Sequence, residues 1–406
     1  MKRALATVAL IALALGATPS PPPVMPVPQG NEMGFGDWTV HFDLINFATE
    51  SGDFEFPGAV YITRPGGDVR ADSAHGNSDD NTLTLVGHVV MHDTRKRRAT
   101  LTTDKLDIDG DAKVYVATGD VHYVQGDTSA VARDGKLDDT SKRLDLDGNV
   151  KIDRGTSQIL ADHVVYDTDT GKGHAVAKAG TITFPATQPS PSGSPSPSPA
   201  PSASPDDWVV HYTSADFNGK SGDFSIPGAV RVERGSGGDA TADRASGNGK
   251  TKRATLFGHV VVHDVNGSFV ARTGATQSSG PSTLTTDKLD MDDPAKRYVA
   301  TGDVVYVHKD TTVDADKAVL DGNAHLLTMD GKVKILQPPK SLSADHVTYD
   351  TTTGDIHASS DPSRGVVTIF PGGPGPAIAP PKKITVRNPF SKKPAASPAP
   401  SPTPKP

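Results

Sequence analysis

The stretch that decides the fold is Leu144-Asp-Leu-Asp-Gly148-Asn-Val-Lys-Ile152. Apolar residues and glycine hold every second position, and polar or charged residues hold the others. A period of two is typical of a β-strand with one apolar and one polar face. The same alternation runs through three more stretches: Leu327-Thr-Met-Asp-Gly331-Lys-Val-Lys-Ile335, Leu83-Thr-Leu-Val-Gly87-His-Val-Val-Met91 and Tyr115-Val-Ala-Thr-Gly119-Asp-Val-His-Tyr123.

A glycine falls inside the apolar stripe of every such strand. A missing side chain there lets a long strand bend sharply or lets two backbones approach closely. The glycines recur about every 30 residues, which predicts one pair of strands per repeat. Stacked pairs of bent strands predict a curved sheet over an apolar interior, with an Asp-rich exterior. The glycines are Gly58, Gly87, Gly119, Gly148, Gly180, Gly228, Gly258, Gly302, Gly331 and Gly365.

The whole pattern occurs twice. The run from Leu101 to Asp107 recurs unchanged from Leu284 to Asp290, and Tyr115–Val121 has its counterpart at 298–304. The offset is 170 in the early part of the copies and 183 in the late part. We therefore expect two copies of one unit, with an insertion in the second copy near residues 266–282.

Composition supports a strand-rich chain and excludes several functions. Glutamate occurs at only four positions, and Asp, which favours turns, supplies the other acids. Cysteine is absent, which excludes disulfides, thiolate metal sites and cysteine nucleophiles. The net charge is −7, and both the first 17 residues and the segment 371–406 are basic, so the body between them is more acidic still. An acidic body argues against nucleic acid as a partner.

The chain is predicted to divide into six segments. Lys2 and Arg3 precede an apolar run to Ala17, which predicts an export signal over 1–17 and a soluble periplasmic protein; retention of this run as an anchor is the alternative. We expect a Pro-rich unstructured segment at 18–36 and β domains at 37–185 and 207–370. A Pro/Ser-rich linker is expected at 186–206 and a basic Pro-rich unstructured tail at 371–406.

Local signals of catalysis or metal binding are weak. His88 and His92 have a spacing that suits a metal on a helix, but on a strand they lie about 13 Å apart. The Asp-x-Asp runs that begin at Asp107 and Asp167 resemble calcium loops but lack the Glu that closes an EF-hand. Turn chemistry explains these aspartates. No nucleophile elbow, Walker loop or Rossmann fingerprint occurs. We expect no enzyme, no cofactor and no metal.

The repeated pattern resembles the OstA-like domain of the LptA family. The pattern is an apolar-x-Gly-x-Val step, then Ala-Asp-x-Val/Leu-x-Tyr/Leu-Asp, then a turn such as 167–171, and it covers about 37–185 and 207–370. The family forms the periplasmic bridge for lipopolysaccharide transport, with relatives in LptC and the N-terminal part of LptD. The resemblance implies an all-β fold of two tandem β-jellyrolls shaped as bent half-pipes. It also implies acyl chains held inside and assembly through edge strands with other lipopolysaccharide-transport proteins.

On this interpretation the apolar stripe lines a groove for lipopolysaccharide or a similar amphipathic envelope lipid. A closed core without ligand is the alternative for the same residues. Two other functions remain open: a structural or adhesive β-repeat protein of the envelope, and a β-solenoid polysaccharide enzyme. The candidate groove residues are Leu83, Leu85, Val89, Met91, Tyr115, Val121, Tyr123, Leu144, Leu146, Val150, Ile152, Val260, Val262, Tyr298, Val304, Tyr306, Leu327, Met329, Val333 and Ile335.

Overall fold

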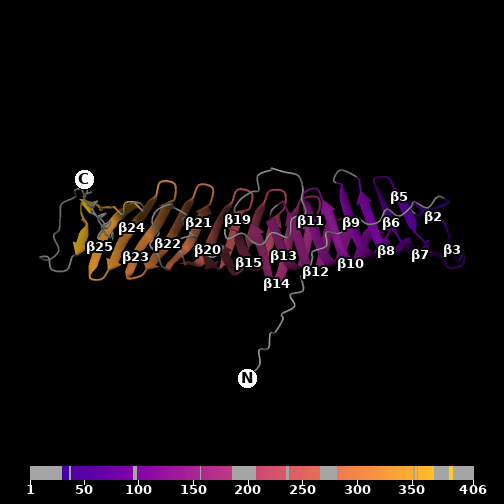
Figure 1. The fold of residues 1–406 in the computed structure, drawn as a ribbon, viewed down its shortest axis with the longest axis horizontal. Helices are drawn as coiled ribbons and strands as arrows, with labels where there is room; N and C mark the ends of the chain where they lie inside the picture. Colours follow the sequence, from indigo (N-terminus) through magenta and orange to yellow (C-terminus); the bar gives the residue numbers. More distant parts are fainter. Residues whose placement is uncertain are drawn as a thin grey trace, which may run out of the picture. The chain divides into compact units, whose positions relative to one another are not determined.

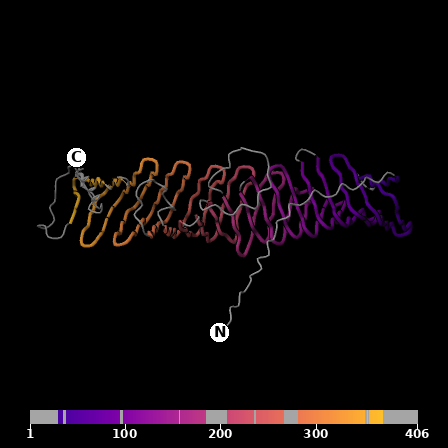
Figure 2. The backbone as a smooth tube through the Cα atoms, viewed as in Figure 1, coloured from indigo at the N-terminus to yellow at the C-terminus, as the bar shows by residue number. Residues whose placement is uncertain are grey.

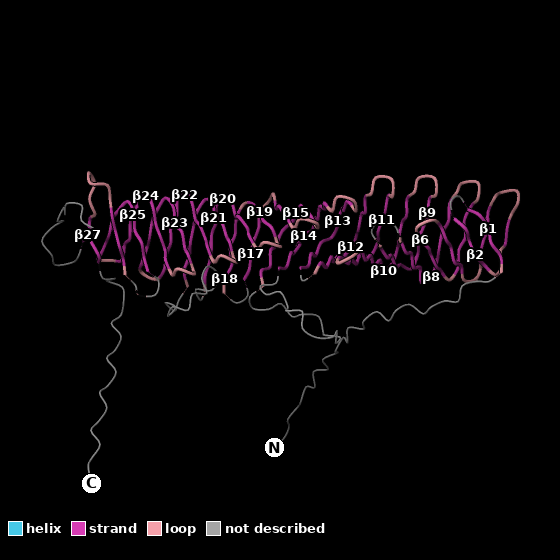
Figure 3. The backbone as a smooth tube through the Cα atoms, turned by 90° about the horizontal axis from the view of Figure 1, so that it is seen from above, coloured by secondary structure: helices cyan, strands magenta, loops and turns pink. Residues whose placement is uncertain are grey.

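In a computed structural model of the chain, the described residues form strands and turns. These residues are 30–369, with breaks at 36–37, 95–97, 156, 185–206, 235–236, 266–280, 351–352 and 354, together with 384–386. No helix occurs among them (Figure 3), and none of the described residues forms a helix able to cross a membrane. The all-β prediction is confirmed.

The chain divides into two compact units. Unit 1 comprises residues 1–169 and 183–207, and unit 2 comprises residues 170–182 and 208–406. Most of strand β14 (Lys172–Phe184) thus belongs to unit 2, although the sequence pattern placed it at the end of the first copy. Its first residues contact β15 (Trp208–Asn218): His174 Nδ1 lies 2.7 Å from Asp216 Oδ1.

Unit 1 is built from long antiparallel strands that pair in chain order. Each strand from β8 to β13 pairs with the next one, and Figures 1 and 2 show these strands as successive passes of the chain. The strands are β8 (Thr82–Asp93), β9 (Ala99–Asp109), β10 (Val114–Gln125), β11 (Thr128–Asp138), β12 (Arg143–Arg154) and β13 (Ser157–Asp167).

The short strands before β8 show that the sheet has two walls. Asp72 alone separates β6 from β7; β7 pairs with the first half of β8, and β6 pairs with its second half. Wall A consists of β3, β4, β7 and the halves of the long strands that pair with them in sequence, beginning with the first half of β8. Wall B consists of β2, β5, β6 and the other halves, beginning with the second half of β8. The strands are β2 (Trp38–Phe42), β3 (Asn46–Phe47), β4 (Asp53–Phe56), β5 (Val60–Arg64), β6 (Gly67–Ala71) and β7 (Ser73–Asn77).

Unit 2 repeats this order strand by strand. Gly58 and Gly228 lie in equivalent turns, and Gly119 and Gly302 hold the same place in β10 and β22. The inserted residues 266–280 lie outside the described residues, between β20 and β21. The strands are β16 (Asp223–Ile226), β17 (Val230–Arg234), β18 (Gly238–Ala242), β19 (Arg244–Asn248), β20 (Arg253–Asp264), β21 (Ser282–Asp292), β22 (Arg297–His308), β23 (Thr311–Asp321), β24 (Leu326–Gln337), β25 (Lys340–Asp350), β26 (Ile356–Ser359) and β27 (Val367–Ile369).

Two segments expected to lack structure contribute edge strands. Strand β1 (Asn31–Phe35) pairs with β2, and β28 (Ile384–Val386) pairs with β26. Both predictions were wrong at these residues, because the exposed backbone of an edge strand offers hydrogen bonds that even a short neighbouring segment can take. The segments predicted as export signal (1–17) and linker (186–206) lie outside the described residues.

Candidate functional site: the apolar interior of each unit

The apolar stripe predicted from the sequence lies inside the units. Eighteen of the 20 candidate residues are buried, with Leu85, Val89 and Val260 fully enclosed; Tyr306 and Leu327 are half-buried. Their side chains share one face of each strand, as the period of two requires. The stripe is therefore covered by other side chains of the chain itself. Whether it also holds lipid is a proposal, taken up below.

The glycine step is the point where each long strand bends. Gly119 and Asp120 both have positive φ, of 82° and 43°, and the pairing of β10 with β11 shifts register between Thr118 and Val121. This is a β-bulge, which bends and twists the strand that carries it. A Cβ on Gly119 would lie 2.4 Å from Asp104 Oδ2, so only glycine fits. The expected bend at the glycine is present.

One bend in each unit has a buried threonine on the neighbouring strand. Thr103 Oγ1 lies 3.0 Å from the carbonyl oxygen of Thr118 and 2.9 Å from that of Gly119, and the two carbonyls share its single donated proton. Thr286 makes the same contacts with Thr301 and Gly302, both at 3.0 Å. Both threonines are at most 5% exposed. The hydroxyl thus adds a buried hydrogen bond to the carbonyls at the bulge.

The interior also contains residues that strict alternation does not identify. In β9 the buried positions are 101, 103, 106 and 108, so the phase slips by one at the bend. The slip occurs because the bulged strand places two residues opposite one residue of its neighbour. In the sequence, a shift of the apolar positions by one residue, directly after Thr-Asp, is the signal that could have identified the buried residues of β9. Fully buried examples are Leu106, Val164 and Leu289.

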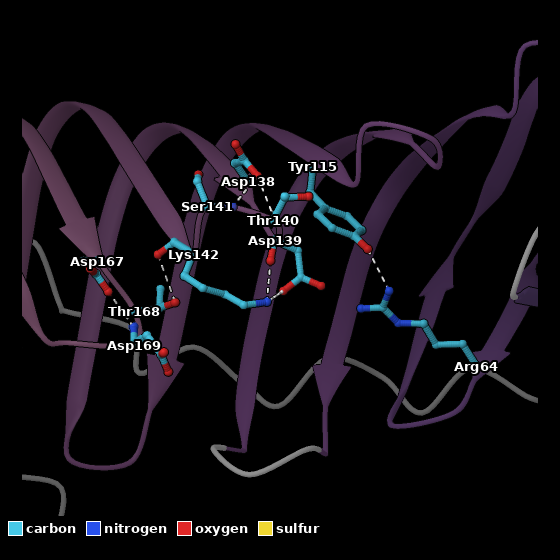
Figure 4. Close-up of polar contacts among 10 residues, drawn as sticks. All are labelled: Arg64, Tyr115, Asp138, Asp139, Thr140, Ser141, Lys142, Asp167, Thr168 and Asp169. Atoms are coloured by element: carbon cyan, nitrogen blue, oxygen red, sulfur yellow. Dashed lines mark hydrogen bonds and ion pairs between the residues drawn. The ribbon is translucent and has the colours of Figure 1, made fainter.

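The aspartates that resemble calcium ligands cap turns. Asp109 Oδ1 accepts the backbone N–H of Ala112 at 2.8 Å, and Asp167 Oδ1 accepts that of Asp169 at 2.8 Å (Figure 4). Asp138 accepts two backbone N–H groups in the next turn of the same kind. The prediction that turn chemistry explains the calcium-like runs is confirmed for Asp109 and Asp167. No group of three metal ligands occurs in the part of the chain that the structure describes.

The outer side of the bends carries histidine–aspartate pairs. His88 Nδ1 lies 2.7 Å from Asp72 Oδ2, and His259 Nδ1 lies 2.8 Å from Asp243 Oδ2. Asp72 accepts a hydrogen bond from the His88 ring and carries a negative charge, and both effects raise the pKa of His88 above its usual 6.5; Asp243 raises the pKa of His259 in the same way. His92 instead contacts Asp68 at 3.0 Å. The two histidines of the i, i+4 pair thus have separate partners.

Far from the bends, an arginine connects the two walls. Arg64, from wall B, donates through Nη1 to the hydroxyl of Tyr115 on wall A at 2.7 Å (Figure 4), and its guanidinium stacks 4.2 Å from the centre of the Trp38 ring. Arg234 takes the same position in unit 2, 4.7 Å from the centre of the Trp208 ring and 3.4 Å from the hydroxyl of Tyr298. We call these ends of the walls the mouth of each unit.

Comparison with protein families gives a match over both copies. Residues 68–172 and 278–355 match the family described as LptA/(LptD N-terminal domain) LPS transport protein. Each copy thus contains a segment that matches the LptA family model, which supports the predicted resemblance. The first LptA-like segment runs from β6 to the first residue of β14, and the second from just before β21 past the end of β25.

Comparisons with curated proteins and with solved structures gave no relative of high similarity. The search of curated proteins found no match. Among solved structures, the chain is similar to LptH, the LptA homologous periplasmic component of the conserved lipopolysaccharide transport device from Pseudomonas aeruginosa. The identity is 14% and the TM-score 0.24, and the match covers 25% of this chain and 75% of LptH.

Proposed function

We propose that this protein is a periplasmic carrier or bridge that holds the acyl chains of lipopolysaccharide, or of a similar amphipathic envelope lipid, between its two walls. The observation that carries the proposal is the family match over both copies, in a fold whose buried apolar stripe recurs on β8, β10 and β12 and again on β20, β22 and β24. Acyl chains bind such a surface through apolar burial, which contributes about 25 cal/mol per Å².

Lipid entry requires the walls to separate. The stripe residues are buried against one another, so a bound acyl chain replaces contacts between walls rather than contacts with water. The bends at the glycines are where the angle between the walls can change, because each wall is internally hydrogen-bonded. The pairing of β28 with β26 is an example of a short segment added to a sheet edge, and neighbouring transport proteins would add on by the same kind of strand pairing.

Photocrosslinking from opposite faces of one strand tests the lipid position. A photoreactive residue at Leu146, 1% exposed on the inner face, should crosslink to lipid in the native host. The same residue at Asp145, on the outer face of β12, is the matched control and should not. Circular dichroism must first show that both variants keep the sheet. Equal yields at the two positions would contradict the proposal.

A structural β-repeat protein of the envelope is the second candidate. The observation in its favour is that the stripe residues are buried against one another, as in the core of a purely structural domain. Mass spectrometry of the protein purified from its host separates the two functions. Co-purified lipid in amounts near one molecule per unit supports the carrier, and lipid-free protein supports the structural function.

A further inference from the structure

An inward-facing cation lies at the mouth of unit 1. Val60, Ile62 and Arg64 share one face of β5, and the first two are buried in the interior. Arg64 thus ends an apolar stripe with a positive charge. Among the described residues, it forms no ion pair; its contacts are the Tyr115 hydroxyl and the faces of the Trp38 and Tyr115 rings. A guanidinium has five N–H donors, and one of them suffices for the hydroxyl.

In unit 2, the equivalent arginine has a carboxylate partner. Arg234 Nη2 lies 3.3 Å from Asp293 Oδ1, and the side chains of both residues are less than one-fifth exposed. The hydroxyl of Tyr298 donates to the same carboxylate oxygen at 3.3 Å. Burial raises the pKa of Tyr298, which keeps this hydroxyl protonated and able to donate. A carboxylate therefore sits against the arginine and the tyrosine.

The matching position in unit 1 has no side chain. Asp293 corresponds to Gly110, at the offset of 183 that also relates Tyr298 to Tyr115. The two units thus present the same aromatic and guanidinium groups, but only unit 2 supplies its own anion. A ligand that places an anion there in unit 1 gains a charge-assisted hydrogen bond that the chain itself does not make.

We propose that Arg64, with Trp38 and Tyr115, binds the anionic head group of an amphipathic ligand at the mouth of unit 1, while Asp293 fills the equivalent place in unit 2. This inference rests on the proposed function, because the ligand's acyl chain would lie along the stripe that Arg64 ends. It makes the two copies unequal: unit 1 selects anionic amphiphiles, and unit 2 does not.

The two tryptophans of the chain make the proposal measurable, since each one lies in one of the two clusters. In the full chain carrying Trp208→Phe, the emission of Trp38 reports on unit 1 alone. The probes are dodecyl phosphate, dodecanol and inorganic phosphate, each below any micelle concentration. Dodecyl phosphate should bind at least about tenfold tighter than dodecanol, or about 1.4 kcal/mol, and inorganic phosphate alone should bind far more weakly than either.

Three variants test which residues cause the preference for dodecyl phosphate over dodecanol. Arg64→Met keeps the apolar stem and should reduce the affinity for dodecyl phosphate to that for dodecanol. Gly110→Asp leaves Arg64 in place and supplies a carboxylate, with the same expected loss; only the movable side chain of Asn81 lies near the new Cβ. Conversely, Asp293→Gly in a chain with Trp38→Phe should create the preference in unit 2.

The outcomes separate the two proposals. Equal binding of dodecyl phosphate and dodecanol would overturn the anion site and leave the lipid interior standing. A preference that persists in Arg64→Met and Gly110→Asp, with the sheet intact by circular dichroism, would also overturn it. Inorganic phosphate binding as tightly as dodecyl phosphate would show a simple anion site and refute the head-group assignment. Binding of neither amphiphile would refute both the carrier function and this inference.

Discussion

At the scale of single residues, the bends depend on two consecutive positive φ angles. Gly119 is followed by Asp120, and Gly148 by Asn149; Asp, Asn and His occupy the second position at several bends. Asn and Asp visit the left-handed region more readily than other non-glycine residues, whereas β-branched residues almost never do. The pair Gly-Asp or Gly-Asn thus encodes the bend locally.

Gly119→Ala should lower the free energy of unfolding by about 1–3 kcal/mol, because the new Cβ meets Asp104 and the backbone has a φ of 82°. Urea unfolding followed by circular dichroism measures this. Gly58→Ala is the matched control: nothing lies within 4 Å of its Cβ, and we expect a change within about 1 kcal/mol. Equal losses in both variants would show that the bend is not the cause.

His88 should titrate above 6.5 because Asp72 stabilises the imidazolium. Because the pKa of His88 is higher in the folded chain than in the unfolded chain, the pair stabilises the fold fully at pH values below the unfolded pKa. This stabilisation is lost as the pH rises through the folded pKa. NMR titration of the imidazole signals gives the value directly. Asp72→Asn should bring the pKa of His88 back toward 6.5 and leave that of His259 unchanged; a shift of both would argue against a local cause.

At the scale of strands, each bend involves two neighbours with different roles. At Gly119, β10 keeps its alternation through the bulge, whereas the preceding strand β9 loses one step of phase and supplies Thr103. Thr286 on β21 has the same place beside Gly302 on β22. At these two bends, one strand contacts the bulge of the next through a hydroxyl.

Thr103→Val should cost about 1–3 kcal/mol, because the shape is kept while the carbonyls of Thr118 and Gly119 lose a buried donor. Chemical denaturation measures the cost. Thr102→Val, one residue earlier and half-buried, is the matched control and should stay within about 0.5 kcal/mol of the parent chain. If Thr103→Val were as stable as the control, the threonine would not hold the bend.

At the scale of the whole molecule, the boundary of unit 2 lies earlier than the sequence repeat indicates. The Cβ positions of Gly173 and Gly180 are only 2.2 Å from Phe217 and 2.6 Å from Tyr212, so each aromatic ring lies against bare backbone. Residues 170–182 therefore complete unit 2.

A fragment of residues 170–406 should be more stable than one of residues 208–406 by about 3 kcal/mol or more, because the shorter fragment exposes the rings of Tyr212 and Phe217. The midpoints of urea unfolding compare the two. Gly180→Val in the longer fragment is a control that should reduce its advantage, since the new side chain collides with Tyr212. Fragments of equal stability would place the boundary where the sequence repeat does.

The sequence by itself determined the strands, the bends, the duplication and most of the buried stripe, because period-two alternation and glycine spacing are local properties of the chain. The resemblance to the LptA family was also visible at that level, and the family match over both copies supports it. It did not determine the phase slip beside Thr103 or the edge strands β1 and β28, which depend on the neighbouring strand. Only the tertiary structure brought Arg64 to Tyr115, 51 residues away on the opposite wall, and Asp293 to Arg234. Such contacts follow from the angle between the walls, and no local pattern records that angle.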